Sequence, residues 1–179
     1  DAGATSSDAL DGTVSVTTYG TVDDGTPGTQ TLTYTATDAA GNTSGASRTV
    51  TVTDVTAPVI TLSGSGTVTH EGGDSYTDAG ATAADAVDGT VSVTTTGSVT
   101  VGTVGDYTLT YSATDAAGNT ATSTRVVSVT DTTGPVISVS GSTTVTHEAA
   151  ATYTDAGATA VDAVGGTLSV TTRGTVRGG

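Results

Sequence analysis

The chain has 179 residues, a mass of 17.1 kDa and a formal net charge of -14, from 18 acidic residues against four arginines. With no basic face to neutralise phosphates, nucleic-acid binding is excluded, and with no Cys, disulfide and thiolate chemistry are excluded. No apolar run approaches the ~18 residues of a membrane span, so we expect no membrane insertion.

A repeat of 77 residues organises the chain. The string DAGAT begins at Asp1, Asp78 and Asp155, and residues 1–77 match residues 78–154 at 51 positions without a gap. A period of 77 exceeds the ~20 to 50 residues of solenoid units, so each copy is predicted to be a small domain with its own core.

In chain order, the first predicted elements are strands in residues 1–54. Between Thr31 and Thr37, Leu32, Tyr34 and Ala36 share one face and every other position is Thr, which is the period-two pattern of a half-buried strand. Further strands are predicted at Val14/Val16 and Arg48–Thr53, separated by the turn formers Asp11-Gly12 and Asp38–Asn42.

A short polar joint follows at Asp54–Pro58, where proline disfavours a continuous sheet, and it recurs at Asp131–Pro135. These joints divide the chain into three predicted parts. Residues 1–54 are the later part of one repeat, residues 55–131 are a complete repeat, and residues 132–179 are the early part of a third.

The complete repeat carries the densest strand signals. Alternating or β-branched pairs occur at Ile60/Leu62, Val91/Val93, Val127/Val129 and the copy Thr108–Thr114, with Leu168/Val170 following in the third part. Closely spaced short strands without helical periodicity predict an all-β fold of tandem antiparallel β-sandwiches. Tyr34 and Tyr111 are expected to anchor the cores, with the hydroxyl bonded to backbone as in a tyrosine corner.

Catalysis is not predicted. His70 and His147 are copies of one position in separate repeats, so we interpret each as a partly covered residue bonded to polar neighbours of its own copy. Ser lies in no nucleophile-elbow pattern and Lys is absent, so no nucleophile with an activating base can be assembled.

Six motifs cover nearly all of residues 55–131: PVITLSG, VTHEGG, YTDAGATA, DGTVSV, YTLTYSATDAAGN and STRVVSVTD. In this order they resemble bacterial immunoglobulin-like (Ig-like) repeats of large secreted or surface proteins, especially the module of some pesticidal crystal proteins and, more distantly, HYR domains. The resemblance implies tandem Ig-like domains in an extracellular bacterial protein, where such modules act as spacers, stalks or adhesive segments. The third copy departs from it at Gly165, which replaces Asp11 and Asp88, and at Ala149–Ala151, which replaces Gly72–Asp74.

Sixteen of the 18 acids are Asp, a residue that both forms turns and binds Ca²⁺ through hard oxygens. In an Ig-like sandwich the loops at Asp85–Gly89 and Asp115–Asn119 would lie near each other and near Asp54, with Asp131 and Asp162 at the next joint. We therefore consider calcium between domains, with ordinary turns as the alternative. The candidate ligands are Asp54, Asp85, Asp88, Asp115, Asn119, Asp131 and Asp162.

The first functional hypothesis is a non-catalytic structural or adhesive segment of a bacterial surface protein, forming a rod or stalk whose partners are neighbouring repeats. A variant is a filament in which residues 132–179 of one copy complete residues 1–54 of the next. The second hypothesis is a module that binds carbohydrate or a host receptor. Sugar platforms usually need exposed aromatic residues, and only Tyr19 lies near a turn without being repeated as Tyr.

Overall fold

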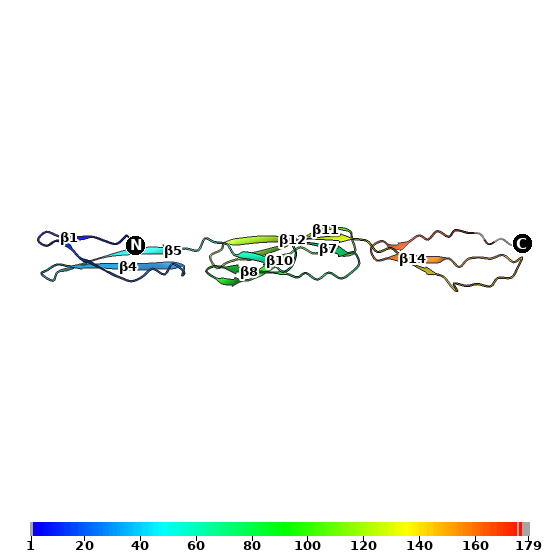
Figure 1. The fold of residues 1–179 in the computed structure, drawn as a ribbon, viewed down its shortest axis with the longest axis horizontal. Helices are drawn as coiled ribbons and strands as arrows, with labels where there is room; N and C mark the ends of the chain where they lie inside the picture. Colours follow the sequence, from blue (N-terminus) through cyan, green and yellow to red (C-terminus); the bar gives the residue numbers. More distant parts are fainter. Residues whose placement is uncertain (1, 175, 177–179) are drawn as a thin grey trace. The chain divides into compact units, whose positions relative to one another are not determined.

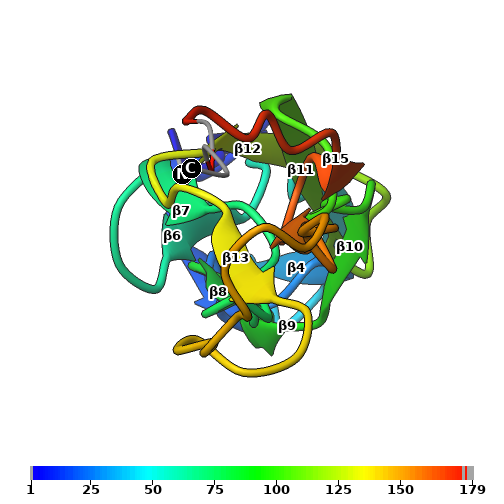
Figure 2. The same ribbon diagram turned by 90° about the vertical axis from the view of Figure 1, so that its right-hand side faces the viewer.

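Alternating small and β-branched residues give a chain of strands and turns. The computed structural model describes residues 2–174 and residue 176 (Figure 1), and no helix that could cross a membrane occurs among them. The strands are β1 Ser6–Asp8, β2 Gly12–Val14, β3 Val16–Tyr19, β4 Gly28–Thr37, β5 Thr43–Val52, β6 Val59–Leu62, β7 Thr67–Glu71, β8 Ala81–Asp85, β9 Gly89–Val91, β10 Val93–Thr96, β11 Gly105–Thr114, β12 Thr120–Thr130, β13 Val136–Val139, β14 Ala158–Asp162 and β15 Gly166–Leu168. Figure 2 labels the strands β6, β9, β13 and β15, which Figure 1 leaves without labels.

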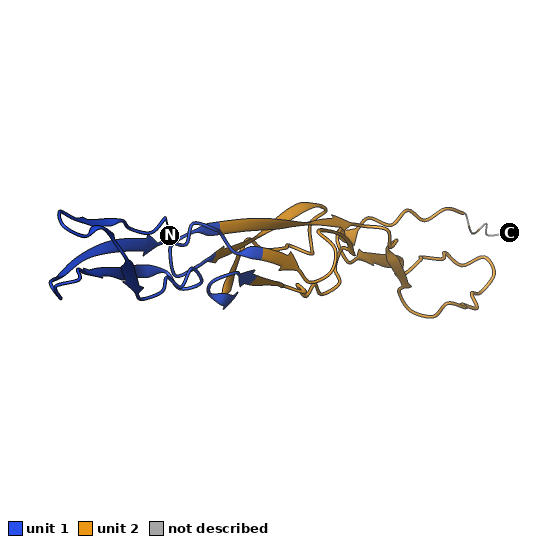
Figure 3. Cartoon of the chain, turned by 60° about the vertical axis from the view of Figure 1, so that its left-hand side comes forward, with its two compact units in different colours: residues 1–59, 84–91, 114–120 blue, residues 60–83, 92–113, 121–179 orange. Residues whose placement is uncertain are grey.

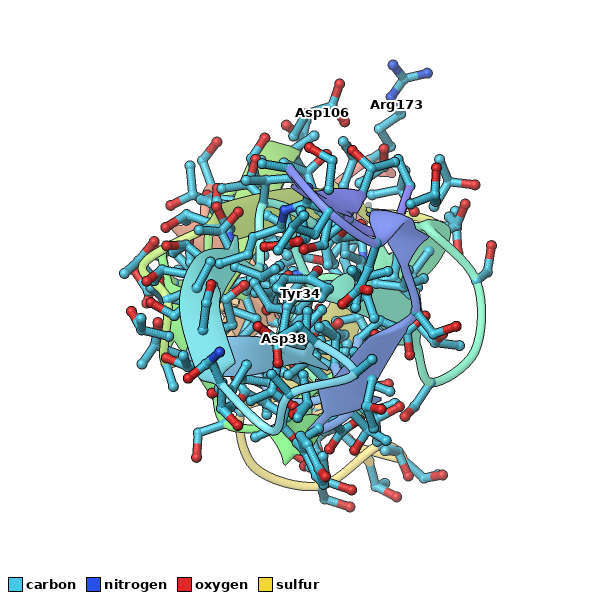
Figure 4. All side chains as sticks on the ribbon, turned by 90° about the vertical axis from the view of Figure 1, so that its left-hand side faces the viewer. Tyr34, Asp38, Asp106 and Arg173 are labelled. Atoms are coloured by element: carbon cyan, nitrogen blue, oxygen red, sulfur yellow. The ribbon has the colours of Figure 1, made fainter. Side chains whose placement is uncertain are left out.

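The chain divides into two compact units (Figure 3), and unit 1 comprises residues 1–59, 84–91 and 114–120. Within it, β3, β4 and β5 form an antiparallel sheet and β1 pairs with β2. Leu32 and Tyr34 are buried, whereas Thr31 and Thr33 are exposed, which confirms the predicted alternation. Tyr34 points toward the interior in Figure 4.

Unit 2 comprises residues 60–83, 92–113 and 121–179. Its largest sheet has the order β10-β11-β12-β7, and β12 and β7 run parallel, which adds one parallel pair to the predicted antiparallel pattern. The inward side chains of β11 and β12 form the core: Leu109, Tyr111, Ala113, Val127 and Val129 are at most 4% exposed. A further sheet with the order β13-β14-β15 belongs to the same unit.

An arginine lies inside this core. Arg125 has the same inward parity as Val127 and Val129 and is 1% exposed, the sort of burial that a charged side chain tolerates only when it is paired. Its guanidinium forms an ion pair with Asp78 through Nη1. It also donates to the carbonyl oxygens of Ser65 at 3.0 Å and Ser63 at 2.5 Å. These bonds replace the hydrogen bonds to water that the guanidinium loses when it is buried.

The tyrosine of the core completes this network. The Tyr111 hydroxyl donates to Asp78 at 2.8 Å and accepts a bond from Arg125 Nη1 at 3.0 Å. Burial and the neighbouring Asp78 carboxylate raise the pKa of Tyr111 to about 12. Tyr111 is therefore a core anchor as predicted, but the predicted backbone partner was wrong, because its hydroxyl bonds Asp78 and the buried Arg125.

Local turns hold several of the aspartates. Asp38 accepts bonds from both the backbone N–H and the side-chain amide of Asn42, each at 2.7 Å. Asp8 accepts bonds from the backbone of Leu10 and Asp11 in the same manner. These bonds confirm the interpretation that many of the Asp residues form turns.

The two histidines contact residues of their own copy. His70 Nε2 lies 3.1 Å from the Asp74 carbonyl oxygen, and its ring packs edge-on against Tyr76. His147 repeats the arrangement with Ala151 and Tyr153. The local contacts are thus confirmed for both histidines, but the predicted partial cover holds only for His70, because His147 is exposed.

Within unit 2, the end of β7 contacts the joint and turn of the third repeat. The Glu71 carboxylate accepts bonds from the backbone N–H groups of Thr132 and Thr133, both at 3.0 Å, and from the Thr132 hydroxyl at 2.7 Å. These donors, the Thr132 backbone first, lower the pKa of Glu71 to about 2. Gly73, at φ +83°, lies so close to Ala163 that a Cβ would meet the Ala163 Cβ at 2.6 Å.

Candidate metal centre

Three aspartates of unit 1 converge at the joint that follows β5. Asp54 lies in the joint, Asp85 ends β8 and Asp88 immediately precedes β9. One carboxylate oxygen from each lies within 4.8 Å of the other two. Three carboxylates at this spacing repel one another unless a cation or solvent intervenes.

The turn between β8 and β9 fixes the first of these carboxylates. Asp85 Oδ1 accepts bonds from the backbone N–H groups of Val87 at 2.7 Å and Asp88 at 3.1 Å, which is a local Asx turn. These two bonds lower the pKa of Asp85, so its side chain is an anion at neutral pH. The side chain is also largely covered, since Asp85 is only 9% exposed.

The other two carboxylates are each held through one oxygen. Asp54 Oδ1 accepts a bond from Thr56 N at 3.1 Å, within the joint itself. Asp88 Oδ2 accepts a bond from Ala116 N at 2.7 Å, so it ties the β8–β9 turn to the loop between β11 and β12. The same bond occurs between Asp11 and Ala39 of the preceding copy, at 2.9 Å.

Asp115 and Asn119 bond to each other beside the three converging aspartates. Asp115 Oδ1 accepts from Asn119 N at 2.7 Å and Asp115 Oδ2 from the Asn119 side-chain amide at 2.8 Å. The same amide group lies 3.3 Å from the Asp54 carbonyl oxygen. Both residues therefore stiffen the loop and link it to the joint, while the converging oxygens come from Asp54, Asp85 and Asp88.

The structure brings two aspartates together at the second joint, within unit 2. Asp131 and Asp162 line one concave surface with residues 132–135, Gly165 and Leu168. Asp162 Oδ1 accepts bonds from Val164 N and Gly165 N, which reproduces the turn of Asp85. The position of Asp88 is taken by Gly165, and in the described ranges no third acidic or His side chain completes a group here.

The proximity of the loops at Asp85–Gly89 and Asp115–Asn119 was predicted from the sequence, but the particular bond from Ala116 N to Asp88 was not. Its signal was present, because the pair Asp11 and Ala39 recurs as Asp88 and Ala116 at the 77-residue offset. A bond from a backbone N–H carries no residue signature, however, since any residue except proline supplies one.

These repeats match one protein-family model and parts of solved structures. The model of the family described as "Bacterial surface protein, Ig-like domain" matches residues 1–52 and 60–129. Among solved structures, the lipoprotein BT2262 from Bacteroides thetaiotaomicron matches with 32% identity and a TM-score of 0.39, over 43% of this chain and 39% of that one. No curated protein sequence gives a significant match.

A second solved structure holds CBM51-2 in complex with GlcNAc and INT domains of ZmpB from Clostridium perfringens. It matches with 24% identity and a TM-score of 0.35, over 47% of this chain and 20% of that one. The matched segments cover 39% of the lipoprotein chain and 20% of the ZmpB chain, which is less than half of either. Since the family model covers well over half of the residues, the chain belongs to the bacterial surface protein Ig-like domain family.

Proposed function

We propose that the chain is an extracellular, structural segment of a bacterial surface protein, in which tandem Ig-like repeats form a stalk that separates other functional parts from the cell. The family supports the surface role, because it is one of bacterial surface proteins. The 77-residue periodicity supports the structural role, because each further copy of the domain lengthens the chain by one period.

The observation that carries the proposal is that two copies repeat the same contact between an arginine and a buried tyrosine. Arg48 lies over the ring of Tyr34 at 5.6 Å, and Arg125 lies over the ring of Tyr111 at the same distance. The copies thus keep this contact, although Arg48 is exposed and Arg125 is buried. The outward Thr residues of the strands are solvated, as the surface of a spacer requires.

The proposed domain limits are 1–54, 55–131 and 132–179. Each joint between them, at residues 54–58 and 131–135, is free of regular strand structure. The family model also matches two separate segments, 1–52 and 60–129, with a gap over the first joint. Both observations support a boundary at the polar joints.

Surface labelling tests the proposal. An antibody against residues 55–131 should label intact cells of the source bacterium, with an antibody to a cytosolic protein as the negative control. Labelling that occurs only after permeabilisation would refute a surface role. Deletion of one 77-residue period from the parent gene should then move an epitope beyond the repeats closer to the envelope, and an unchanged distance would refute the spacer role.

A carbohydrate-binding role has weaker support. Sugar rings stack on exposed aromatic side chains, and Tyr19, at 59% exposure, is the one Tyr classed as exposed in the part of the chain that the structure describes. A glycan array would decide: saturable binding that is lost in Tyr19→Ala would favour this role over the structural one.

A further inference from the structure

We propose that Asp54, Asp85 and Asp88 form a binding site for a divalent cation, Ca²⁺, that fixes the joint after β5 to the β8–β9 turn. This inference goes beyond the structural role and does not depend on where the protein is located. It begins from two oxygen atoms that the fold leaves without partners.

Those two atoms belong to the same cluster. Across residues 2–174 and 176, the buried side-chain oxygens without a hydrogen-bond partner are Asp54 Oδ2 and Asp85 Oδ2. Asp85 as a whole is 9% exposed, so water has little access to it. Native structures rarely leave buried polar atoms unsatisfied, and a buried anionic oxygen demands a partner most strongly. A cation bound between the two oxygens supplies that partner.

The hydrogen bonds of the cluster point to the same conclusion. Each of the three carboxylates uses one oxygen to hold its own loop, through Thr56 N, through Val87 N and Asp88 N, or through Ala116 N. The second oxygen of each is not used in this way. These hydrogen bonds hold the loops without an ion, and each carboxylate keeps one oxygen for a shared ligand.

The chemistry of these oxygens selects the ion. All three donors are hard carboxylate oxygens, which suit Ca²⁺ or Mg²⁺, and no Cys or His is among them. Two ligands on one Ca²⁺, each at 2.3–2.6 Å, can be at most about 5.2 Å apart. The 4.8 Å limit of the cluster falls within that span. Ca²⁺ also accepts irregular geometry and completes its shell with water, whereas Mg²⁺ demands a near-ideal octahedron.

The chain contains its own comparison site. At the second joint, Asp131 and Asp162 match Asp54 and Asp85, but Gly165 stands where Asp88 would be. A Cβ on Gly165 would lie 3.3 Å from Asp162 Oδ1, so an Asp at this position would bring its carboxylate close to that group. We therefore expect one site in the native chain and a second one in the Gly165→Asp variant.

Isothermal titration calorimetry of the metal-stripped 179-residue chain with CaCl₂ tests the proposal. The wild-type chain should bind one Ca²⁺ with a Kd on the order of 10⁻⁴ M, near the range of extracellular calcium modules. Asp88→Asn keeps an oxygen for Ala116 N but loses the charge, so its Kd should rise at least tenfold. Asp11→Asn alters the same bond in the preceding copy and should leave the Kd unchanged.

Three results would overturn the site. The first is the absence of saturable binding to the wild-type chain up to 10-fold above that Kd. The second is equal affinity in the Asp88→Asn and wild-type chains, with far-ultraviolet circular dichroism showing that both are folded. Should Asp88→Asn fail to fold, Gly165→Asp decides, because a stoichiometry that stays at one contradicts the proposal. A parallel titration with MgCl₂ should give weaker binding, and equal or tighter binding would refute the assignment to Ca²⁺.

Discussion

Replacing Arg125 with Met removes the guanidinium from the core while keeping a long apolar side chain. The substitution leaves Asp78 without its cation and the carbonyl oxygens of Ser63 and Ser65 without their charged donor. Removing one partner of a buried ion pair typically costs about 3–5 kcal/mol. Asp78 keeps its bonds from Tyr111 and Gly80, and its side chain is 24% exposed, so we expect the lower end, about 3 kcal/mol.

Thermal unfolding followed by circular dichroism measures this effect. For a domain of this size, a loss of 3 kcal/mol lowers the melting temperature by roughly 12–24 °C. Arg173→Met is the control, because Arg173 is exposed and projects outward in Figure 4, as Asp106 also does. Its effect should stay within about 0.5 kcal/mol. Amide exchange in β11 and β12 assigns the loss to the correct repeat.

The pH dependence of the same variant is a second readout. Burial alone would raise the pKa of Asp78, but the bonds from Tyr111 and Arg125 bring it below its ordinary value. A lowered folded-state pKa means that the stabilisation is present above the unfolded pKa of about 3.9 and is lost as the pH falls below it. The stability gap between wild type and Arg125→Met should therefore narrow in acid. A loss below 1 kcal/mol at neutral pH, or a gap that widens in acid, would refute this reasoning.

Two further substitutions test neighbouring contacts. Tyr111→Phe keeps the ring but removes the donor to Asp78, so we expect a loss of about 1–2 kcal/mol in thermal unfolding, and a neutral result would contradict the network. Glu71→Gln should speed amide exchange at Thr132 and Thr133 without changing the melting temperature of the main core. Because the pKa of Glu71 is about 2, wild-type protection of these amides should persist at pH 4 and fall toward pH 2; loss already at pH 4 would contradict the assigned bonds.

The alternation of residues was sufficient to predict the buried faces of β4 and β11. Leu32 and Tyr34 are buried between exposed threonines because a strand turns successive side chains to opposite faces, and this rule is local. The interior position of Arg125 follows from the same rule, yet an arginine side chain is usually expected to be exposed to solvent. Only the partners supplied from distant segments, Asp78 and the carbonyl groups of Ser63 and Ser65, make its burial tolerable. Those partners are 47 to 62 residues away, beyond the reach of a local pattern.

The candidate site, too, was predicted from the sequence only in part. The convergence of Asp54, Asp85 and Asp88 was predicted from the arrangement of loops in an Ig-like sandwich, and the structure brings these three together. The sequence also offered Asp115 and Asn119 as ligands, with a turn as the alternative. Their bonds to each other match the turn alternative, and the same bonds recur in the preceding copy. Which oxygens a turn consumes is decided by loop geometry, which residue type alone does not report.

Some positions at which the copies differ in sequence lie beside a joint, and the contacts of that joint explain the difference. Gly73 has φ +83° and contacts Ala163, whereas its counterpart Ala150 keeps a left-handed backbone, φ 63°, at a cost of about 1 kcal/mol. The backbone conformation is thus a property of the fold, while the absence of a Cβ at Gly73 is required by the neighbouring repeat. Gly165 shows the converse, since the turn of Asp162 persists without the acid that Asp88 supplies in the preceding copy. The residues that the copies share therefore keep the backbone conformation of the domain, whereas the residues that differ determine the contacts at each joint.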